Sequence, residues 1–380
     1  MIPAPATLAM LGGGQLGRFF VSAAHELGYR VMVLDPEEGC PAGLIADEQV
    51  VAAYDDAEAL AYLAKNCVAA TTEFENVPAT TLEVLAQHMP VYPGAGTVAI
   101  AQDRIAEKCF LRDHGFPTTP FFVIHDDSDL AQVSKDLFPA IVKISRFGYD
   151  GKGQQRVASL DQAKQALQRF NAPCVIEKML NLDLEVSLVM ARNAAGETAC
   201  FPVAENQHQH GILDISIVPA SASQSLLDRA KQMANQLAEK LDYVGVLTVE
   251  FFISDGELLI NEIAPRPHNS GHYTIDGCIT SQYEQQVRAM CGLPLGATTL
   301  HSATVMVNLL GDLWFANDNG HCVDPQWTLL NQIPNLKLHL YAKQVARPGR
   351  KMGHFTIIDD NAKNAIKMAL TARRTIGVKD

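Results

Sequence analysis

The sequence predicts an α/β and α+β protein, with a Rossmann-like parallel sheet at its N-terminal end and a small β-rich domain at its C-terminal end. Over residues 7–92 short apolar runs alternate with amphipathic stretches, the βαβ rhythm of a parallel sheet. Over residues 121–263 the apolar runs are rich in β-branched and aromatic residues and few helices separate them, which favours antiparallel pairing. A length of 380 residues fits two to three domains of about 150 residues each.

The N-terminal elements follow in the order that a parallel sheet needs. Apolar runs at 7–11, 30–34, 49–53 and 67–70 predict strands, and an amphipathic stretch at 15–27 predicts a helix. The sequence PGAGT at 93–97 interrupts this pattern, and a helical stretch at 103–114 then ends in Gly115. We therefore expect a first domain over residues 1–100.

The central and C-terminal elements continue from there. The central strands are expected at FFVI, AIVKI, PCVIE, LEVSLVMA, VLTVEFFI and ELLI. The longest helix is expected at 226–241, where Leu226, Met233 and Leu237 recur at helical spacing. After Pro294 the runs TVMVNLL, LKLHLY and HFTII predict further strands, followed by a helix at 361–373. We expect a second domain over residues 101–300 and a third over 301–380.

Composition and charge exclude several classes of protein. Forty-two acidic against 30 basic residues give a net charge of −12, and no basic patch appears, so no nucleic-acid partner is expected. No apolar run approaches the roughly 20 residues that span a bilayer, and no basic segment opens a signal peptide, so we expect a cytoplasmic protein without a membrane partner. The eight cysteines form no CxxC pair and are expected to be buried thiols.

A glycine-rich turn lies between the first strand and the first helix. The run from Gly12 to Gly17 satisfies GxGxxG, and Asp35 closes the next strand. Glycines at such a turn let the backbone approach a phosphate at the helix N-terminus, which NAD or any other phosphate could supply. A tight turn with only a structural role is the alternative interpretation.

A second glycine-rich segment, FGYDGKGQ at 147–154, lies between two predicted strands. Three glycines and a lysine suit a hairpin loop that closes over phosphates with its backbone N–H groups. It is not a Walker A loop, because no Ser or Thr follows the GK pair. Lys143 on the preceding strand would place an ammonium group beside the same phosphates, which an ordinary flexible hairpin would not explain.

Acidic residues in later strands predict a metal site. Glu250 and Glu262 each lie within an apolar run, where an unpaired carboxylate would be costly. With Asn261 they offer the oxygen ligands that Mg²⁺ accepts beside substrate phosphates. The loop RPHNSGH follows at 266–272 and adds a cation, an imidazole and an amide, which suit a transferring phosphoryl group. Zinc held by His268 and His272 is a minor alternative.

The last basic cluster is expected to bind an anion. Lys343 and the run ARPGRKMGH gather basic side chains around a Pro-Gly turn, which would clamp a substrate phosphate. A solvated charge run is the alternative.

Together these motifs resemble those of the ATP-grasp ligases, and over nearly the whole chain those of the 5-(carboxyamino)imidazole ribonucleotide synthases of purine biosynthesis. The resemblance rests on GGGQLGR, TEFENV, QDR, GYDGKGQ, EKML, ENQHQHGI, NEIAPRPHNSGH and ARPGRKMGH in this order. It implies an ATP-grasp fold whose two sub-domains clamp ATP. It also implies that ATP, with Mg²⁺ or Mn²⁺, activates bicarbonate to carboxyphosphate, and that the amine of 5-aminoimidazole ribonucleotide captures the carboxyl group. A homodimer is expected, and NAD is not.

The resemblance also assigns residues. The ATP-binding set is Arg104, Lys143, Gly148, Tyr149, Asp150, Gly151, Lys152, Gly153, Gln154, Glu177, Lys178, Met179, Leu180, Glu185, His208, Asn261 and Glu262. The metal ligands are Glu250 and Glu262, and Arg266, His268 and Asn269 are expected to face bicarbonate and carboxyphosphate. The ribonucleotide set is Gln15, Leu16, one or both of Glu73 and Glu75, Tyr149, Asp150, Lys152, Lys343 and Arg350. Ala342 stands where the family usually has Gly.

Two alternatives remain open. A formate-dependent glycinamide ribonucleotide formyltransferase shares the fold and the RPH loop, but Gln15 and Asn269 stand where that relative usually has Glu and Asp. A non-catalytic nucleotide sensor would retain the fold without the chemistry, and the presence of Lys143, Glu262 and Arg266 argues against it.

Overall fold

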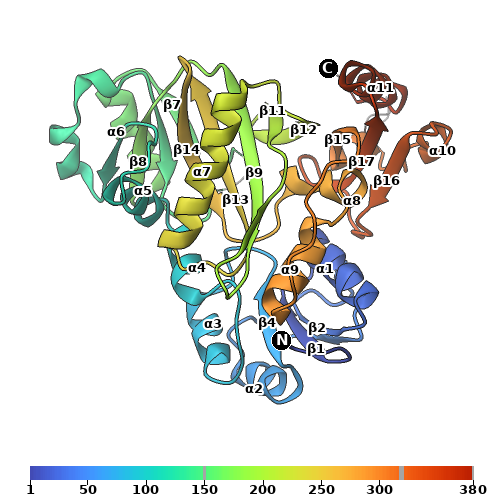
Figure 1. The fold of residues 1–380 in the computed structure, drawn as a ribbon. Helices are drawn as coiled ribbons and strands as arrows, with labels where there is room; N and C mark the ends of the chain where they lie inside the picture. The colour runs from blue at the N-terminus through green and yellow to red at the C-terminus, as the bar shows by residue number, and fades with distance from the viewer. Residues whose placement is uncertain (149–150, 316–320, 379–380) are drawn as a thin grey trace.

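The computed structural model describes residues 1–148, 151–315 and 321–378. Within these residues the strands form three sheets, and the expected combination of α/β and α+β architecture is confirmed. The ribbon shows the N-terminal sheet at one end, a small sheet with its helix α6 at another, and a large sheet between them that runs into the C-terminal segment (Figure 1). No described helix is long and apolar enough to cross a membrane.

The N-terminal sheet is parallel and has the order β3-β2-β1-β4. Its strands are β1 (Thr7–Leu11), β2 (Arg30–Leu34), β3 (Glu48–Val50) and β4 (Ala69–Thr72), with helices α1 (Gln15–Glu26), α2 (Ala57–Asn66), α3 (Ala79–Ala86) and α4 (Ala95–Ala101). The bounds of the third and fourth strands lie one to three residues away from the predicted ones, because the short apolar runs could not fix them. Helix α9 (Gln282–Cys291) packs onto α1, and its residues Tyr283, Val287 and Met290 join the core beside Phe20.

The second sheet is antiparallel and has the order β5-β8-β6-β7. It comprises β5 (Phe121–Ile124), β6 (Ala140–Ile144), β7 (Gln154–Val157) and β8 (Cys174–Lys178), with α5 (Arg104–Asp113) before it and α6 (Leu160–Phe170) packed on it. Asp103 caps α5, because its side chain accepts hydrogen bonds from the backbone N–H groups of Ile105 and Ala106. That cap fixes where Arg104 begins the helix at the edge of the large cavity described below.

The large sheet has the order β14-β13-β9-β11-β12-β15-β17-β16, with β10 beside β9. Its strands are β9 (Leu184–Arg192), β10 (Thr198–Cys200), β11 (Ala204–Gln209), β12 (Ile212–Val218), β13 (Gly245–Ser254), β14 (Glu257–Ala264), β15 (Ala303–Leu310), β16 (Leu336–Leu340) and β17 (Lys351–Asp359). The helices of this region are α7 (Gln224–Lys240), α8 (Thr274–Gly277), α10 (Trp327–Asn331) and α11 (Ala362–Thr375). The predicted apolar face of α7 is confirmed, because Met233 and Leu237 are buried in the core under this sheet.

The C-terminal strands are continuous with this large sheet. Strand β15 pairs with β12, and β17 and β16 extend the sheet beyond it, while α11 packs on β15 and β17 (Figure 1). This continuity brings the start of β17 to the wall of the same cavity that the central strands line.

Candidate active site

A single cavity of about 910 Å³ collects most of the predicted site. The predicted residues that line it are Gln15, Leu16, Glu73, Glu75, Arg104, Lys143, Gly148, Gly151, Lys152, Gly153, Gln154, Glu177, Lys178, Met179, Leu180, Glu185, His208, Glu250, Asn261, Glu262, Arg266, His268 and Asn269. They come from the two antiparallel sheets, from the segment after β4, from the glycine loop, from the segment after β14 and from α1 and α5. Tyr149 and Asp150 lie outside the described residues.

A buried charge cluster forms the wall at β6 and β8. Glu177 lies 2.8 Å from the ammonium nitrogen of Lys143 and 3.6 Å from that of Lys108. Burial acts to raise the pKa of Glu177, but Lys108 and Lys143 outweigh it and lower that pKa to about 2. The second carboxylate oxygen, Oε1, has no hydrogen-bond partner among the described residues. The cluster therefore places a carboxylate and the ammonium group of Lys143 on the cavity wall, while Lys108 supports Glu177 from behind.

The glycine loop adopts backbone conformations that glycine favours. Gly151 and Gly153 have φ of +74° and +71°, and a Cβ at Gly153 would lie 2.4 Å from the Ile144 side chain. A Cβ at Gly151 would lie 3.0 Å from the carbonyl oxygen of His210, in the turn between β11 and β12. The loop thus runs close to the β11–β12 turn across the cavity.

The two predicted metal ligands face each other. Glu250 on β13 and Glu262 on β14 are direct partners in the antiparallel register, so their side chains lie on one face of the sheet. Burial, followed by the charge of Glu262, raises the pKa of Glu250 to about 7. The amide oxygen of the adjacent Asn261 is buried and has no hydrogen-bond partner among the described residues. Two repelling carboxylates and an unpaired amide oxygen fit a hard divalent cation.

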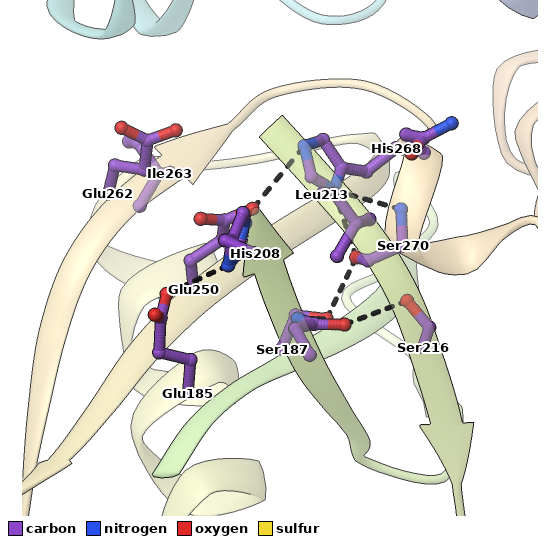
Figure 2. Close-up of polar contacts among 12 residues, drawn as sticks. Glu185, Ser187, His208, Leu213, Ser216, Glu250, Glu262, Ile263, His268 and Ser270 are labelled. Atoms are coloured by element: carbon purple, nitrogen blue, oxygen red, sulfur yellow. Dashed lines mark hydrogen bonds and ion pairs between the residues drawn. The ribbon is translucent and has the colours of Figure 1, made fainter. Parts of the chain in front are cut away.

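Basic and amide groups surround this carboxylate pair. The Arg266 Nε atom donates to Glu75 over 2.6 Å, and His268 Nε2 lies 3.4 Å from a carboxylate oxygen of Glu250 (Figure 2). Burial, followed by the charge of Arg266, lowers the pKa of His268 well below its ordinary value, so its imidazole is neutral. The RPH segment therefore lies against Glu250, one of the two predicted metal ligands.

Two further groups complete this wall. His208 Nδ1 lies 2.9 Å from Glu185 (Figure 2). Burial acts to lower the pKa of His208, but its contact with Glu185 and the neighbouring carboxylates outweighs burial and raises that pKa. Asn269 exchanges two amide hydrogen bonds with Asn308, of 3.1 and 2.5 Å. An aspartate at 269 could not donate the first of these.

The N-terminal glycine turn is occupied by the protein's own carboxylates. The N–H of Gly13 donates to Asp35 Oδ2 over 2.7 Å, and the N–H of Gly14 donates to Glu73. Asp35 also accepts from Tyr54 and from the N–H of Glu37. An NAD ribose and pyrophosphate would have to displace these bonds, so the geometry agrees with the expectation that NAD is not bound. The same turn brings Glu73 to the cavity wall.

The C-terminal basic residues differ in whether they line the cavity. Lys343 and Arg350 are absent from the residues that line the cavity, whereas Lys351 lines it. Lys343 Nζ donates to the Lys351 carbonyl oxygen over 2.7 Å, and an Arg350 guanidinium nitrogen donates to the Val345 carbonyl oxygen over 2.8 Å. The motif GRKMGH contained Lys351, but only the start of β17 decides which of its basic side chains faces the cavity.

Other lining residues carried no clear signal in the sequence. Glu107 on α5 is buried and accepts from the backbone N–H of Ile263 over 2.6 Å, while burial raises its pKa to about 7. Arg156 on β7 also lines the cavity. Both stand in ordinary amphipathic stretches, where a charged residue is usually solvated. The described residues contain one group of side chains close enough to share a metal ion, and it consists of Asp276, His339 and His354. Neither His268 nor His272, the two candidate zinc ligands, belongs to this group.

Comparison with known proteins places the chain in a family. Residues 6–102 match the ribonucleotide synthetase preATP-grasp domain, residues 109–283 the ATP-grasp domain, and residues 304–368 the phosphoribosylaminoimidazole carboxylase C-terminal domain. N5-carboxyaminoimidazole ribonucleotide synthase from Brucella melitensis is 46% identical over 357 residues, which cover 93% of this chain and 96% of that protein.

Solved structures agree with these matches. The N5-carboxyaminoimidazole synthetase from Staphylococcus aureus, complexed with ADP, is 36% identical with a TM-score of 0.90, and the alignment covers 98% of both chains. The synthase from Aspergillus clavatus, in complex with ADP and 5-aminoimidazole ribonucleotide, is 30% identical with a TM-score of 0.88, covering 98% of this chain and 99% of that one. A relative 46% identical over 93% of this chain, together with the domain matches and the solved structures, shows that the chain belongs to the N5-carboxyaminoimidazole ribonucleotide synthase family of ATP-grasp enzymes.

Proposed function

We propose that this chain carboxylates 5-aminoimidazole ribonucleotide with bicarbonate at the expense of ATP, in purine biosynthesis. A bicarbonate oxygen attacks the γ-phosphorus of ATP and ADP leaves, giving carboxyphosphate. The amine nitrogen of the ribonucleotide then attacks the carboxyl carbon, the bond to phosphate breaks, and the products are N5-carboxyaminoimidazole ribonucleotide and inorganic phosphate. The family assignment supports this reaction class.

One observation carries the proposal: a single cavity holds the residues for both partial reactions. Lys143, Glu177 and the glycine loop, which are the predicted ATP contacts, line this cavity together with Gln15, Leu16 and Glu73, which are predicted to contact the ribonucleotide. Arg266, His268 and Asn269 line the same cavity, and His268 lies 3.4 Å from Glu250. An intermediate formed at the phosphate end could therefore meet the amine without leaving the protein, which matters because carboxyphosphate hydrolyses readily.

Glu250 and Glu262 would hold Mg²⁺, or Mn²⁺ in its place, with Asn261 beside them. Their mutual repulsion and the unpaired Asn261 oxygen fit such an ion. When bound, the ion would offset the charge of the ATP phosphates. The protein's own groups do the rest: Lys143 and Lys152 would contact phosphate oxygens, and Arg266 would hold bicarbonate and then the developing carboxyphosphate charge. Closure of the glycine loop would exclude water.

The remaining sites and partners are proposed on the same basis. The ribonucleotide would contact Gln15, Leu16, one or both of Glu73 and Glu75, Tyr149, Asp150 and Lys152, with Lys343 and Arg350 toward its phosphate. We also propose a cytoplasmic homodimer that binds these small molecules and no nucleic acid. The domain division at residues 100 and 300 stays a prediction.

Initial ADP release in the presence of ATP and Mg²⁺ tests the proposed function. We expect release that depends on 5-aminoimidazole ribonucleotide plus bicarbonate and not on glycinamide ribonucleotide plus formate. Dependence on the second pair would make the protein a formyltransferase. If neither pair of substrates causes ADP release but the protein still binds ATP, the result would indicate a nucleotide sensor.

A further inference from the structure

A chain of buried hydroxyl and amide groups runs through the large sheet to His268. Its members are Ser216 on β12, Asn206 on β11, Ser187 on β9 and Ser270 after β14, and each is at most 5% exposed (Figure 2). The hydroxyl of Ser216 bonds the amide oxygen of Asn206 over 2.8 Å, the amide nitrogen of Asn206 bonds the hydroxyl of Ser187 over 2.8 Å, and that hydroxyl bonds the Ser270 hydroxyl over 2.8 Å. The Ser270 hydroxyl lies 2.9 Å from His268 Nδ1.

The direction of donation along this chain is fixed. Because Ser216 donates to the amide oxygen of Asn206, the Asn206 nitrogen faces Ser187 and must donate to it. Ser187 therefore uses its own proton toward Ser270, and Ser270 uses its proton toward His268 Nδ1. The backbone N–H of Ser270, which can only donate, also lies 3.3 Å from that nitrogen.

Two donors thus converge on Nδ1 of His268, so Nδ1 is an acceptor. A neutral imidazole carries one N–H, which must then be on Nε2. Nε2 lies 3.4 Å from a carboxylate oxygen of Glu250, in the wall of the cavity (Figure 2). In this tautomer the atom that faces the reactants has a proton to give and no lone pair with which to take one.

We propose that the Ser216–Asn206–Ser187–Ser270 chain locks His268 as the Nε2–H tautomer, so that His268 serves the reaction as a hydrogen-bond donor to a carboxyphosphate oxygen, not as a base. The four chain members are positioning residues, because none of them reaches the reactants except through His268. The proton released from the ribonucleotide amine goes to another acceptor, such as a phosphate oxygen of carboxyphosphate. The inference rests on the proposed function for its chemistry, but not for the tautomer itself.

The tautomer can be measured without turnover. Long-range ¹H–¹⁵N correlation spectra of the full chain labelled at histidine report which ring nitrogen is protonated, and the spectrum of His268→Gln assigns the signal. We expect Nε2–H in the wild type. A proton on Nδ1 overturns the proposal whether or not the protein carboxylates anything, so this failure is distinct from failure of the proposed function.

Two substitutions of His268 separate a donor from a base. Glutamine offers an amide N–H near the position of Nε2 but cannot accept a proton at neutral pH, whereas alanine offers neither. We expect His268→Ala to lower kcat by roughly 100-fold or more, as loss of a transition-state donor does, and His268→Gln to restore at least about 10-fold of that loss. Equal kcat in the two variants would overturn the donor role.

Substitution of Ser187, in the middle of the hydrogen-bonded chain, tests the role of that chain. Ser187→Ala removes one hydroxyl, and we expect kcat to fall by roughly 3- to 10-fold at unchanged KM for ATP, because a loosened donor is weaker in the transition state. Ser216→Ala, farther from His268, should lower kcat less. Thr248→Val is the matched control, since the Thr248 hydroxyl is buried in the same sheet and has no hydrogen-bond partner among the described residues.

These variants also distinguish positioning from general stability. If Ser187→Ala and Thr248→Val share one kcat, or if Ser187→Ala changes only thermal stability, the chain does not position His268. Should Ser187→Ala fail to fold, Ser187→Cys keeps a weak donor of similar volume, and we expect its kcat to lie between that of the wild type and that of Ser270→Ala. If Ser187→Cys and Ser270→Ala both have the kcat of the wild type, the proposal is contradicted as well.

Discussion

The Nε atom of Arg266 and a carboxylate oxygen of Glu75 lie 2.6 Å apart, and this ion pair joins the segment after β14 to the segment after β4. Burial acts to raise the pKa of Glu75, but its pairing with Arg266 outweighs burial and holds that pKa below its ordinary value. The two segments are 191 positions apart in the sequence, so the pair fixes the N-terminal sheet region against the central sheet.

Glu75→Gln should therefore lower the free energy of unfolding by about 1–3 kcal/mol, because a partly buried guanidinium loses its anion. It should also raise the KM for bicarbonate, since Arg266 loses the contact that orients it. Urea unfolding and initial rates measure the two effects. Glu284→Gln, which breaks an i,i+4 pair with Arg288 on α9, should cost no more than about 0.5 kcal/mol and leave KM unchanged. Equal losses in both variants would contradict the role given to Glu75.

Glu177→Gln should destabilise the protein by about 3–5 kcal/mol at pH 7 and weaken ATP binding, because Lys108 and Lys143 lose a shared buried anion. The pKa of Glu177 is lowered from 4.5 to about 2, so its contribution is present above pH 4.5 and is lost as the pH falls toward 2. Denaturant melts at pH 7 and pH 3, with ATP titrations, measure this. A mutant as stable as the wild type at pH 7 would refute the charge cluster as a stabilising element.

Glu262→Gln should abolish ADP formation and leave a folded protein. The substitution removes one of the two facing carboxylates and the charge partner of Arg104, which lies 3.2 Å away. Circular dichroism checks folding, and the thermal shift on adding Mg²⁺ should shrink compared with that of the wild type. Glu257→Gln on the same strand is the control, because its carboxylate pairs with Arg229 at an exposed position. ADP release at the wild-type rate by Glu262→Gln would remove that residue from the metal site.

The raised pKa of Glu73 predicts that its contribution to stability changes with pH in the opposite direction to that of Glu177. Burial raises its pKa from 4.5 to about 7, so its favourable contribution is complete below pH 4.5 and is lost as the pH rises through 7. Glu73→Gln, which can still accept from Gly14, should flatten the fall in melting temperature between pH 5 and pH 8. Parallel melting curves for wild type and mutant across this range would show that Glu73 does not titrate there.

Ala342→Gly should stabilise the protein by up to about 1 kcal/mol, because Ala342 has φ of +58°, a left-handed conformation that costs an L-residue with a Cβ. The substitution also tests whether the methyl group affects the ribonucleotide KM. Ala61→Gly, at an exposed position inside α2, should have the opposite sign and cost about 1 kcal/mol. A loss of stability in both variants would contradict the strain at Ala342.

Local patterns predicted most of the strands and the longer helices, since side-chain periodicity and turn residues act within a few positions of the chain. They did not predict β11, because its sequence AENQHQ contains no apolar run, or β12, because Asp214 and Ser216 interrupt its apolar residues. Helix α9 was missed for a related reason: its buried face contains Gln282, Gln285 and Gln286, which bond backbone groups of other segments.

For the site, the sequence by itself determined which residue types are present and in which order: the glycine loop, the lysine on β6, the acids in β13 and β14 and the loop that follows them. Only the tertiary structure decided how they meet. The register of β13 on β14 sets Glu250 opposite Glu262, the start of β17 turns Lys351 into the cavity, and Glu73 bonds Gly14 from 59 positions away. The tautomer of His268 depends on side chains from three strands and from the segment after β14, and two of them, Ser187 and Ser270, are 83 positions apart. Such contacts arise from the packing of distant segments, for which no local periodicity exists.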